Sequence, residues 1–436
     1  MDRRHESKPQ ANRWKMEQRE INSPGEIVVI GGGVIGLACA HYLSLEGRAV
    51  RVIEKETVGA GASHGNCGLI FISHLLPLCS PGVIRHELMR MFRRGSPLYV
   101  DPSPDLVRLV WLLRFAAKCN PKHLQHAIRA RADILRYSDD LYRQLLDAQD
   151  IECEHERKGV LLVFRSRAAM EAYGQTLGML EPYGIEAKAY KGAALTELEP
   201  GLRDDLWGGW HHPRDSHLRP DVLVRGWKNK LARNGVKFEE NCAFRHFVSP
   251  RPGSVQLQTD RGVFTADACV IAAGAWTPEL IRGLPVRLPM QPGKGYSITI
   301  GNRLGCPQIP CIFEERSVVA TPFTHGCRLG GTMEFSGHNT HLVKKRIENL
   351  KAAASEYLKD PPAGPVIEEW AGLRPMMFDD LPVIDRIAGR AELYVATGHG
   401  MMGVSLAPAT GRIVADLVAG RNPQIDISPF GLQRFQ

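Results

Sequence analysis

Three glycines near the N-terminus have the spacing of a phosphate-binding turn. The apolar run EIVVI at 26–30 precedes GGGVIG, in which Gly31, Gly33 and Gly36 fit the pattern G-x-G-x-x-G. Gly31 allows the tight turn, Gly33 lets the backbone approach a pyrophosphate, and Gly36 lets the following helix touch the strand. The phosphates of a dinucleotide would then lie against the free N–H groups at the start of that helix.

An acidic residue follows where a ribose would need it. Glu54 stands at the end of the next apolar run, AVRVI at 49–53. A carboxylate there accepts hydrogen bonds from both ribose hydroxyls and disfavours a 2′-phosphate. A glycine turn without any ligand is the alternative, and it is disfavoured because the strand, the helix and the distal acid are all in place.

The second candidate for chemistry is one arginine near the C-terminal end. Arg374 stands among apolar residues in AGLRPMMFDDLPVID at 371–385, and a guanidinium keeps its charge at any working pH. It therefore needs an anion. A guanidinium can bind a carboxylate through two parallel hydrogen bonds, which would fix both the position and the rotation of a small acid. The alternative is a structural ion pair with Asp379, Asp380 or Asp385.

The residues after the glycine turn favour FAD over NAD. The stretch VGAGASHGNCGLI at 58–70 is rich in small residues and suits a loop that lies against a flat ligand. An NAD enzyme would continue into further βαβ units, and the sequence predicts none. A second G-x-G-x-x-G, at Gly398, Gly400 and Gly403, has no later strand with an acid. It indicates a helix N-terminus that could stabilise partial negative charge on a ring oxygen.

The strands that must position these residues are distant in the sequence. Besides 26–30 and 49–53, the sequence predicts a strand in GVKFEENCAFRHFV at 235–248, one in ADACVIAAGAW at 266–276 and one at 392–397. A sheet built from such segments predicts an α/β fold (α+β overall), with a Rossmann-like dinucleotide-binding domain. The last helix of that domain would bury Val404, Leu406, Ile413, Val414 and Leu417.

The segments between these strands predict a second domain, inserted twice. A helix is expected in HAIRARADILRYSDDLYRQLLDAQD at 126–150, strands at 294–300 and 327–335, and an amphipathic helix at 340–360. These elements fit a mixed or antiparallel sheet that covers the reactive ring. The boundaries predicted are 25–80, 215–285 and 368–436 for the cofactor domain, 81–214 and 286–367 for the substrate domain, and 1–24 for a mobile extension.

Composition excludes several classes of protein. No run of about 18 uncharged apolar residues is present, and the first 24 residues lack the apolar core of a secretory signal. The ten cysteines contain no C-x-x-C pair, so neither a metal site nor a dithiol redox motif is indicated. Free thiols predict a reducing, cytoplasmic location.

A basic segment leaves a question open about partners. Residues 81–130 hold nine Lys and Arg against three Asp and Glu. Nucleic acid is not expected, because no RNA-binding module is attached. Leu106, Val110, Leu113 and Ala117 share one helical face, which indicates either a patch on the inner membrane surface or a buried core helix, and the core helix is favoured.

Taken together, GGGVIG, Glu54, SHGNCG, VIAAGAW, KGYS, GLRP and ATGHGMMGVSLAPATG resemble the D-amino acid oxidase-like family of FAD enzymes, and within it the D-amino acid dehydrogenases. The resemblance extends over residues 26 to 420. It implies noncovalent FAD, with the turn from Gly398 to Gly403 near the pyrimidine edge of the flavin. Some relatives attach the flavin to a histidine or a cysteine, but His64 lies one residue early, so no covalent bond is expected.

The resemblance also implies roles for single residues. Arg374 would hold the substrate carboxylate while hydride passes from the α carbon to flavin N5. Tyr296, in KGYS, would stand on a strand facing the flavin and bond the carboxylate or close the pocket, with core packing as the alternative. Lys294 would lie near the flavin or in solvent, and His399 would be held for its backbone position. The residues predicted to bind the cofactor are Gly31, Gly33, Val34, Ile35, Gly36, Glu54, Lys55, Ser63, Asn66, Gly68, Leu69, Phe244, Ala273, Gly274, Trp276, Gly398, Gly400, Met401, Met402 and Gly403.

The expected reaction is the oxidative deamination of a D-amino acid or a cyclic D-imino acid, which yields an imine that water hydrolyses to an oxo acid. A glycine or sarcosine oxidase and a 2-hydroxy acid dehydrogenase are alternatives on the same scaffold, and a tRNA-modifying oxidase is disfavoured. Oxygen, a quinone and an electron-transfer protein all remain open as the electron acceptor.

Overall fold

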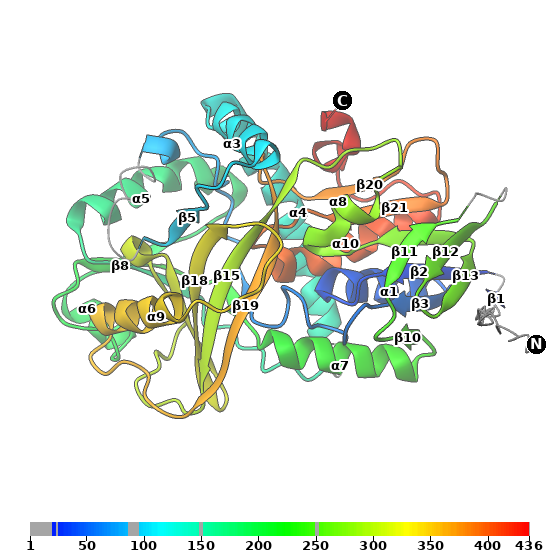
Figure 1. The fold of residues 1–436 in the computed structure, drawn as a ribbon. Helices are drawn as coiled ribbons and strands as arrows, with labels where there is room; N and C mark the ends of the chain where they lie inside the picture. The colour runs from blue at the N-terminus through cyan, green and yellow to red at the C-terminus, as the bar shows by residue number, and fades with distance from the viewer. Residues whose placement is uncertain (1–19, 23–24, 86–95, 148–150, 249–252, 436) are drawn as a thin grey trace, which may run out of the picture.

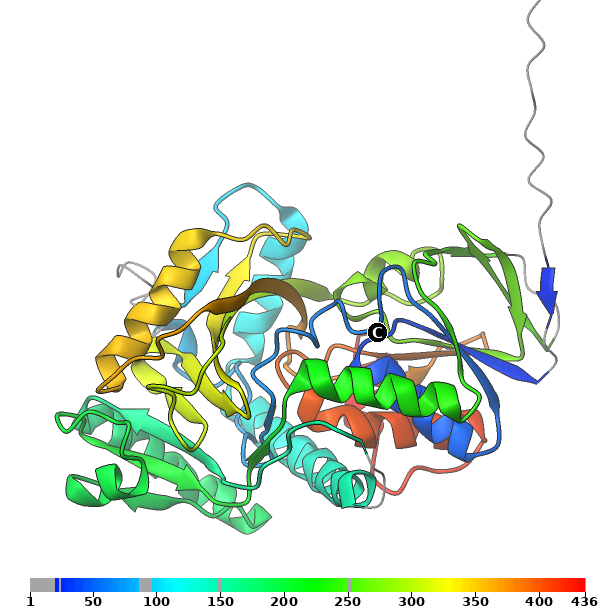
Figure 2. The same ribbon diagram turned by 90° about the horizontal axis from the view of Figure 1, so that it is seen from below.

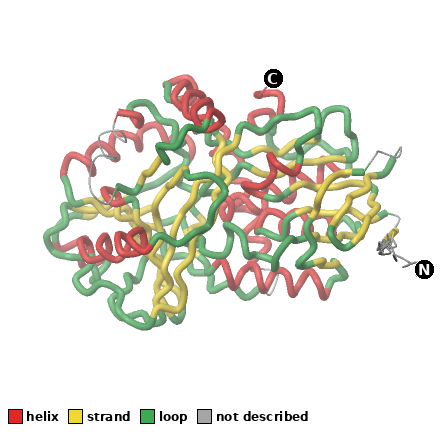
Figure 3. The backbone as a smooth tube through the Cα atoms, in the orientation of Figure 1, coloured by secondary structure: helices red, strands yellow, loops and turns green. Residues whose placement is uncertain are grey.

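The computed structural model describes residues 20–22, 25–85, 96–147, 151–248 and 253–435. The views in Figures 1 and 2 show two lobes, one around a nine-stranded sheet and one around a six-stranded sheet. Both lobes contain helices and strands, as the colours of Figure 3 show. The chain crosses between the lobes several times, so each lobe is built from distant segments.

The six-stranded sheet has the order β10-β3-β2-β14-β21-β20, and all neighbours are parallel except β20 and β21. EIVVI is apolar throughout because β2 is buried on both faces. Ile27 and Val29 pack with the helices on one face, and Val28 and Ile30 pack with a small second sheet on the other. This is the Rossmann-like arrangement that the sequence predicts. Its elements are β2 (Glu26–Ile30), α1 (Val34–Leu45), β3 (Ala49–Ile53), α7 (Pro220–Arg233), β10 (Lys237–Glu239), β14 (Ala268–Ile271), β20 (Val383–Arg386), β21 (Leu393–Thr397) and α10 (Gly403–Val418).

The small sheet has the order β1-β13-β12-β11 and corrects two predictions. The single strand predicted at 235–248 is two strands in different sheets, because the chain turns at Asn241 with a φ of +50°. Part of the predicted mobile extension is ordered, since residues 20–22 pair in parallel with β13; residues 1–19 and 23–24 lie outside the described part. The strands are β1 (Glu20–Asn22), β11 (Phe244–Phe247), β12 (Val255–Thr259) and β13 (Gly262–Ala266).

The nine-stranded sheet is mixed, as predicted. Its order is β19-β15-β18-β17-β16-β6-β8-β7, and β5 pairs with β18. The pairs β16–β6 and β18–β5 are parallel and the others are antiparallel. The expected boundary between 367 and 368 falls inside β19. The strands are β5 (Leu98–Val100), β6 (Val160–Phe164), β7 (Lys188–Tyr190), β8 (Gly208–His212), β15 (Met290–Ile300), β16 (Cys311–Phe313), β17 (Val318–Phe323), β18 (Gly326–Phe335) and β19 (Val366–Met377).

The two faces of this sheet have different neighbours. Helix α9 (Lys344–Tyr357), predicted at 340–360, covers one face, where Ile347 and Leu350 pack with Tyr296 and Ile298. Alternate residues on the same strands point the other way, toward the second lobe. A two-stranded ribbon links the lobes nearby. It consists of β4 (Leu69–Ile70) and β9 (Ser216–His217).

Helix α3 (Leu106–Lys118) corrects the prediction of a buried core helix. Leu106, Val110 and Leu113 expose 75%, 41% and 62% of their surface, and Arg108 and Trp111 are the buried residues of this helix. Most of the basic run that precedes α3 falls at 86–95, outside the described residues. No helix within the described ranges is long and apolar enough to cross a bilayer.

Helix α4 (Pro121–Asp147), predicted at 126–150, packs across the start of α10. Ser138 Oγ and Tyr142 Oη donate to the carbonyl oxygens of Ser405 and Val404 at 2.6 and 2.7 Å. The remaining helices of the described ranges are α5 (Arg167–Leu180), α6 (Ala193–Leu198) and α8 (Thr277–Leu280), with short 3₁₀ turns η1 (Glu181–Tyr183), η2 (Gly274–Trp276), η3 (Glu314–Arg316), η4 (Ser428–Phe430) and η5 (Leu432–Phe435).

Candidate active site

A cavity of about 1370 Å³ lies where the two lobes meet. Its walls include the carboxyl ends of β2, β3, β14 and β21, and residues from the face of the nine-stranded sheet that α9 does not cover. Open parallel sheets bind ligands at the carboxyl ends of their strands. The volume exceeds the roughly 300–1,000 Å³ of an ordinary small-molecule pocket, so a dinucleotide and a small substrate can share it.

The glycine turn has the close contacts that its sequence requires. Gly31 has a φ of +105°, and a Cβ built there would lie 2.5 Å from the carbonyl oxygen of Ala272. A Cβ on Gly36 would lie 1.8 Å from the carbonyl oxygen of Gly31, so the helix does touch the strand. At the first turn of α1, Val34 N donates to Ser63 Oγ at 3.0 Å, which joins the turn to the small-residue loop.

Glu54 is held in place by the backbone around it. Its Oε2 accepts from Gly32 N at 2.7 Å and its Oε1 accepts from Glu56 N at 3.0 Å. The carboxylate lines the cavity at the end of β3 and is half-buried. This position matches a ribose acceptor beside the phosphate turn.

All but three of the residues predicted to bind the cofactor line this one cavity, and the exceptions are glycines. Gly36 packs on Gly31, as described above. A Cβ on Gly68 would lie 1.9 Å from the carbonyl oxygen of Leu218, and one on Gly398 would lie 2.6 Å from Met377 Cγ. These glycines therefore allow close packing behind the cavity wall.

Arg374 lies on β19, on the sheet face that borders the cavity. A Cβ on Gly295 of the neighbouring strand would lie 2.3 Å from its Cζ, so the guanidinium lies flat over that glycine. Its Nη1 donates to the carbonyl oxygen of Thr332 at 2.8 Å. No carboxylate of the described residues pairs with Arg374. Burial lowers the pKa of this guanidinium, which an arriving anion would offset.

The three acids offered as structural partners of Arg374 are engaged elsewhere. Asp379 pairs with Arg434 at 2.9 Å and Asp380 pairs with Arg131 at 2.6 Å. Asp385 accepts from the backbone N–H of Leu432 at 2.8 Å. The alternative prediction, a structural ion pair between Arg374 and one of these three aspartates, is therefore wrong.

A local distortion of β18 aims a carbonyl at Arg374. Thr332 has a φ of +69°, which is rare for a β-branched residue. The register between β15 and β18 shifts at this point, between Lys294 and Tyr296. Backbone strain of this kind persists where the surroundings impose it, often at functional sites.

Trp370 was not predicted, although it lines the cavity beside Arg374. A Cβ on Gly65 would lie 2.1 Å from its Cε3, and a Cβ on Gly372 would lie 1.9 Å from its Cη2. The indole therefore fits only because both neighbours are glycine. The spacing of Trp370, Gly372 and Arg374 at every second residue was the available sequence signal.

Tyr296 does not lie as the resemblance implied. It borders the cavity, but its ring belongs to the core under α9 and its hydroxyl donates to Glu334 Oε2 at 3.0 Å. Lys294 is on the same side of the strand and is buried against Glu334, with Nζ 2.8 Å from Oε1. The residue that faces Arg374 is instead Gly295, which lies between these two on the strand, because side chains alternate along a strand.

His399 also directs its side chain into the protein. Its Nε2 lies 2.9 Å from Thr410 Oγ1, and burial lowers its pKa to about 3, so the imidazole is neutral. The backbone beside it is attached to β19, since Gly400 N donates to the carbonyl oxygen of Pro375 at 3.1 Å. The His399 side chain thus attaches the turn in front of α10 to Thr410 in that helix.

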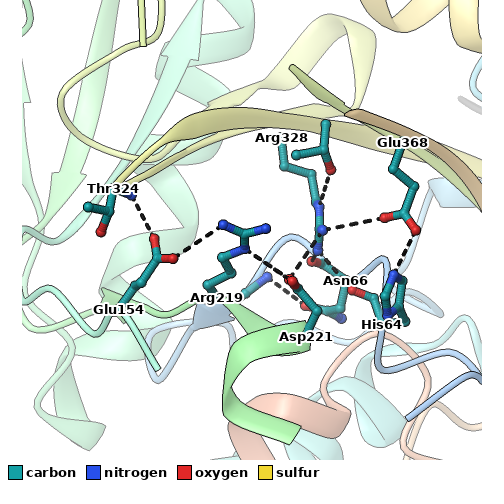
Figure 4. A network of polar contacts seen from close by, with 10 residues as sticks. His64, Asn66, Glu154, Arg219, Asp221, Thr324, Arg328 and Glu368 are labelled. Atoms are coloured by element: carbon teal, nitrogen blue, oxygen red, sulfur yellow. Dashed lines mark hydrogen bonds and ion pairs between the residues drawn. The ribbon is translucent and has the colours of Figure 1, made fainter. Parts of the chain in front are cut away.

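A polar network centred on Arg328 joins the small-residue loop to the nine-stranded sheet (Figure 4). The Arg328 side chain is 1% exposed, and its Nη1 donates to the carbonyl oxygens of His64 and Asn66 at 2.8 and 2.9 Å. Its Nη2 lies 3.3 Å from Asp221 Oδ1. His64 in turn lies 2.7 Å from Glu368 Oε1. These contacts hold the loop that carries Ser63 against the nine-stranded sheet.

The network continues along the joint between the lobes. Arg219 is bonded to Asp221 at 3.1 Å and to Glu154 at 3.2 Å, and Glu154 Oε2 accepts from Thr324 N at 2.6 Å (Figure 4). None of these four residues was predicted, because they come from three separate segments and form no sequence motif.

Comparison with known proteins agrees with this geometry. The model of the family described as FAD dependent oxidoreductase (DAO) matches residues 26–417. A D-amino acid dehydrogenase of Neisseria gonorrhoeae is 30% identical over 419 residues, covering 94% of this chain and 99% of the relative. One from Bradyrhizobium diazoefficiens is 29% identical over 418 residues, covering 94% and 99%.

Solved structures show the same fold. The chain superimposes on glycine oxidase from Geobacillus kaustophilus with a TM-score of 0.73 and 22% identity, over 95% of this chain and 99% of that one. For L-proline dehydrogenase from P. horikoshii the TM-score is 0.71 with 19% identity, over 95% and 98%.

Proposed function

This chain belongs to the family of FAD dependent oxidoreductases, and from that premise we propose that it oxidises a D-amino acid or a cyclic D-imino acid at the α carbon. The observation that carries the proposal is Arg374, a guanidinium on the cavity wall that no carboxylate of the described chain neutralises. The relatives named as D-amino acid dehydrogenases support this choice of substrate.

The residues at the cavity fit FAD. Gly31 and Gly33 line the cavity at the start of α1, where a pyrophosphate would lie, and Glu54 presents carboxylate oxygens where a ribose would lie. The turn that ends at Gly403 places the N-terminus of α10 at the other end of the cavity. FAD, when bound, supplies the hydride acceptor at N5.

The protein's own contribution is orientation. The free edge of the Arg374 guanidinium would bind the substrate carboxylate through two hydrogen bonds, and this contact fixes the direction of the α C–H bond. Thr332 holds the other edge of the guanidinium, so the arginine is already oriented before the substrate arrives. Trp370 covers the same wall and keeps water away from the reacting carbon.

The direct test is anaerobic bleaching of the flavin. The purified holoenzyme is mixed with D-amino acids, cyclic D-imino acids, glycine, sarcosine and 2-hydroxy acids. Bleaching by D-amino or D-imino acids and not by 2-hydroxy acids supports the proposal. Preferential bleaching by glycine and sarcosine would assign an amine oxidase of another specificity, and bleaching by 2-hydroxy acids alone would contradict amine oxidation.

We also propose a peripheral contact between α3 and an anionic membrane surface. Leu106, Val107, Leu109, Val110 and Leu113 together form an exposed apolar side of this helix. Phe115 and Trp111, on the same helix, line the cavity, so a lipid-soluble electron acceptor such as a quinone would reach the flavin from this side. An amphipathic surface of this kind binds the membrane interface without crossing it.

A further inference from the structure

A buried carboxylate stands behind the wall of the cavity without a cationic partner. Asp215 is 1% exposed, its Oδ2 accepts from Ser73 Oγ at 2.5 Å, and its Oδ1 accepts from Ser73 N at 2.9 Å. No lysine or arginine in the described ranges forms an ion pair with it. Burying an unpaired carboxylate is costly, so its presence here calls for an explanation.

Ser73 connects this carboxylate to the reacting end of the cavity. Ser73 lines the cavity, and it lies two residues beyond Phe71, a span of at most about 7 Å. Phe71 N donates to Ser405 Oγ at 3.0 Å, and the same hydroxyl donates to the carbonyl oxygen of Leu69 at 3.1 Å. Ser405 belongs to the first turn of α10, so Ser73 lies near the turn assigned to the flavin.

The fold fixes Asp215 in this position from both sides. The ribbon β4–β9 pairs Ile70 with Ser216, so the chain continues from this pair into Phe71 on one side and Asp215 on the other, and Ser73 then reaches the Asp215 carboxylate through its N–H and its hydroxyl. Gly159 N also donates to the carbonyl oxygen of Asp215 at 3.0 Å. The carboxylate is therefore held by backbone pairing.

Oxidation of an amino acid requires a proton acceptor. A zwitterionic substrate loses one proton from its ammonium group, and the α carbon then loses a hydride with its electron pair. The products are the iminium acid, flavin reduced by two electrons, and one proton bound to a base. Arg374 cannot accept that proton. His74 and His399, which also line the cavity, are weak bases because burial lowers the pKa of each to about 3.

We propose that Asp215 accepts this proton through the hydroxyl of Ser73. Ser73 Oγ takes the ammonium proton while its own proton passes to Asp215 Oδ2, so the hydroxyl is unchanged at the end of the step. The inference rests on the proposed function, because the proton that is transferred comes from the ammonium group of an amino acid substrate.

The surroundings of Asp215 suit the task. Burial raises its pKa to about 7, the hydrogen bonds from Ser73 lower it, and the charge of Asp139 on α4 raises it. The other titratable neighbours are His74, His212 on β8 and Tyr173 on α5, whose hydroxyl lies 2.8 Å from His212 Nε2. Burial lowers the pKa of His212 to about 4 and raises the pKa of Tyr173, so both stay neutral near pH 7.

The test compares flavin reduction at two pH values. Anaerobic stopped-flow bleaching by the best amino acid is measured at pH 7.5 and at about pH 10 for wild type, Asp215→Asn and Ser73→Ala. Both variants should be at least about 100-fold slower than wild type at pH 7.5, the lower range for loss of a general base. Both should approach wild type at the higher pH, because solvent then removes the ammonium proton. Asp139→Asn is the matched control and should keep the full rate, with its acid limb moved to lower pH.

A second measurement does not depend on turnover. Infrared difference spectra across a pH titration should show a protonated carboxyl that ionises near neutral pH in wild type and is absent in Asp215→Asn. An Asp215→Asn defect of equal size at both pH values would make the residue structural and overturn the proposal, as would a Ser73→Ala variant with the wild-type rate at pH 7.5. If no amino acid bleaches the wild-type flavin at either pH, the proposed function itself fails.

Discussion

Arg374 is oriented by neighbours that leave most of its hydrogen-bonding capacity unused. Among the described residues only Nη1 has hydrogen-bond acceptors, at Thr332 and at the sulfur of Met333. Nε and Nη2 stay available for a bidentate partner. Gly295 provides the flat surface under the guanidinium, so the pose depends on a residue that contributes no side chain.

The first prediction concerns the shape of this group. Arg374→Lys keeps the charge and loses the planar guanidinium. The transition-state stabilisation calculated from kcat/KM for the best amino acid should therefore fall by about 2–4 kcal/mol, the value of charged hydrogen bonds. Steady-state kinetics with an artificial acceptor measure this. Arg386→Lys, at an exposed arginine, is the control and should leave kcat/KM unchanged. An Arg374→Lys enzyme with wild-type kcat/KM would remove the carboxylate anchor from the proposal.

A second prediction concerns His64. Its Nε2 is held 2.7 Å from Glu368 Oε1, and its backbone carbonyl is bonded to Arg328, so the ring is committed to the joint between the lobes. Acid precipitation of the purified protein should therefore release all the FAD into the supernatant. A yellow pellet would show a covalent bond and contradict the expectation of noncovalent FAD.

Sequence reasoning reached some of these residues and missed others for a physical reason. Arg374 and Glu54 could be predicted because each stands in a local motif whose chemistry requires it. For Tyr296 two roles stayed open in the sequence, and the structure favours core packing, because KGYS shows which strand carries the residue but not which face of the strand meets the cavity. The place of Asp215 near the cavity could not be predicted, since it depends on the pairing of β9 with β4, two strands that are far apart in the sequence.

Arg328 shows how one side chain can hold several elements together. It lies on β18 and binds the loop at His64 and Asn66 and the first turn of α7 at Asp221, which are far apart in sequence. Removing one partner of a buried charged group leaves the others unpaired.

We therefore predict that Arg328→Met lowers the free energy of unfolding by about 3–5 kcal/mol. Urea denaturation followed by circular dichroism is the measurement. Arg167→Met is the control, because that arginine forms an exposed ion pair with Glu171 and should change stability by less than about 1 kcal/mol. Equal stability of wild type and Arg328→Met would show that the loop is held by other contacts.

Helix α3 illustrates a limit of periodicity. An apolar stripe shows that a helix is amphipathic, but a stripe that faces a core and one that faces a membrane look the same in sequence. In the structure Leu106 and Leu113 are exposed, so this stripe does not face the core of the described chain. The strands of the six-stranded sheet are easier to predict from the sequence, since a short apolar run such as EIVVI between turn residues has few other interpretations.

The exposed side of α3 leads to a prediction about lipid. The protein should sediment with anionic vesicles at low salt, and Leu109→Glu with Leu113→Glu should abolish this because charge replaces the buried apolar contact. Leu45→Glu, at an exposed leucine on α1, is the control and should still sediment. Wild-type protein that stays in the supernatant with and without vesicles would contradict the proposed membrane contact.

The fold as a whole is sensitive to the protonation of one buried acid. Burial raises the pKa of Asp215 from an ordinary 3.8 to about 7, so between these values the folded state binds a proton that the unfolded state has released. The contribution of Asp215 to the free energy of unfolding is therefore largest below about pH 4. It decreases as the pH rises toward 7, by about 4 kcal/mol in total.

The corresponding experiment is a set of urea melts at pH 5 and pH 8. Asp215→Asn should be less stable than wild type, or equal to it, at pH 5 and should gain relative to wild type at pH 8, because the amide never ionises. Asp139→Asn should keep the direction of this pH dependence, with its midpoint moved to lower pH, because the charge of Asp139 raises the pKa of Asp215. A difference between Asp215→Asn and wild type that does not change with pH would mean that the carboxyl titrates outside this range.

The turn from Gly398 to Gly403, which we propose lies beside the flavin, is attached to β19, and this attachment has an optical consequence. The strand that carries Arg374 continues to Pro375, whose carbonyl oxygen accepts from Gly400 N, and Met376 bridges to His399. The anion site and the turn assigned to the ring edge are thus adjacent along one piece of backbone. An unreactive carboxylate such as benzoate should therefore perturb the visible absorption of the oxidised flavin, and the protein would act as a colorimetric sensor of whatever acid occupies Arg374.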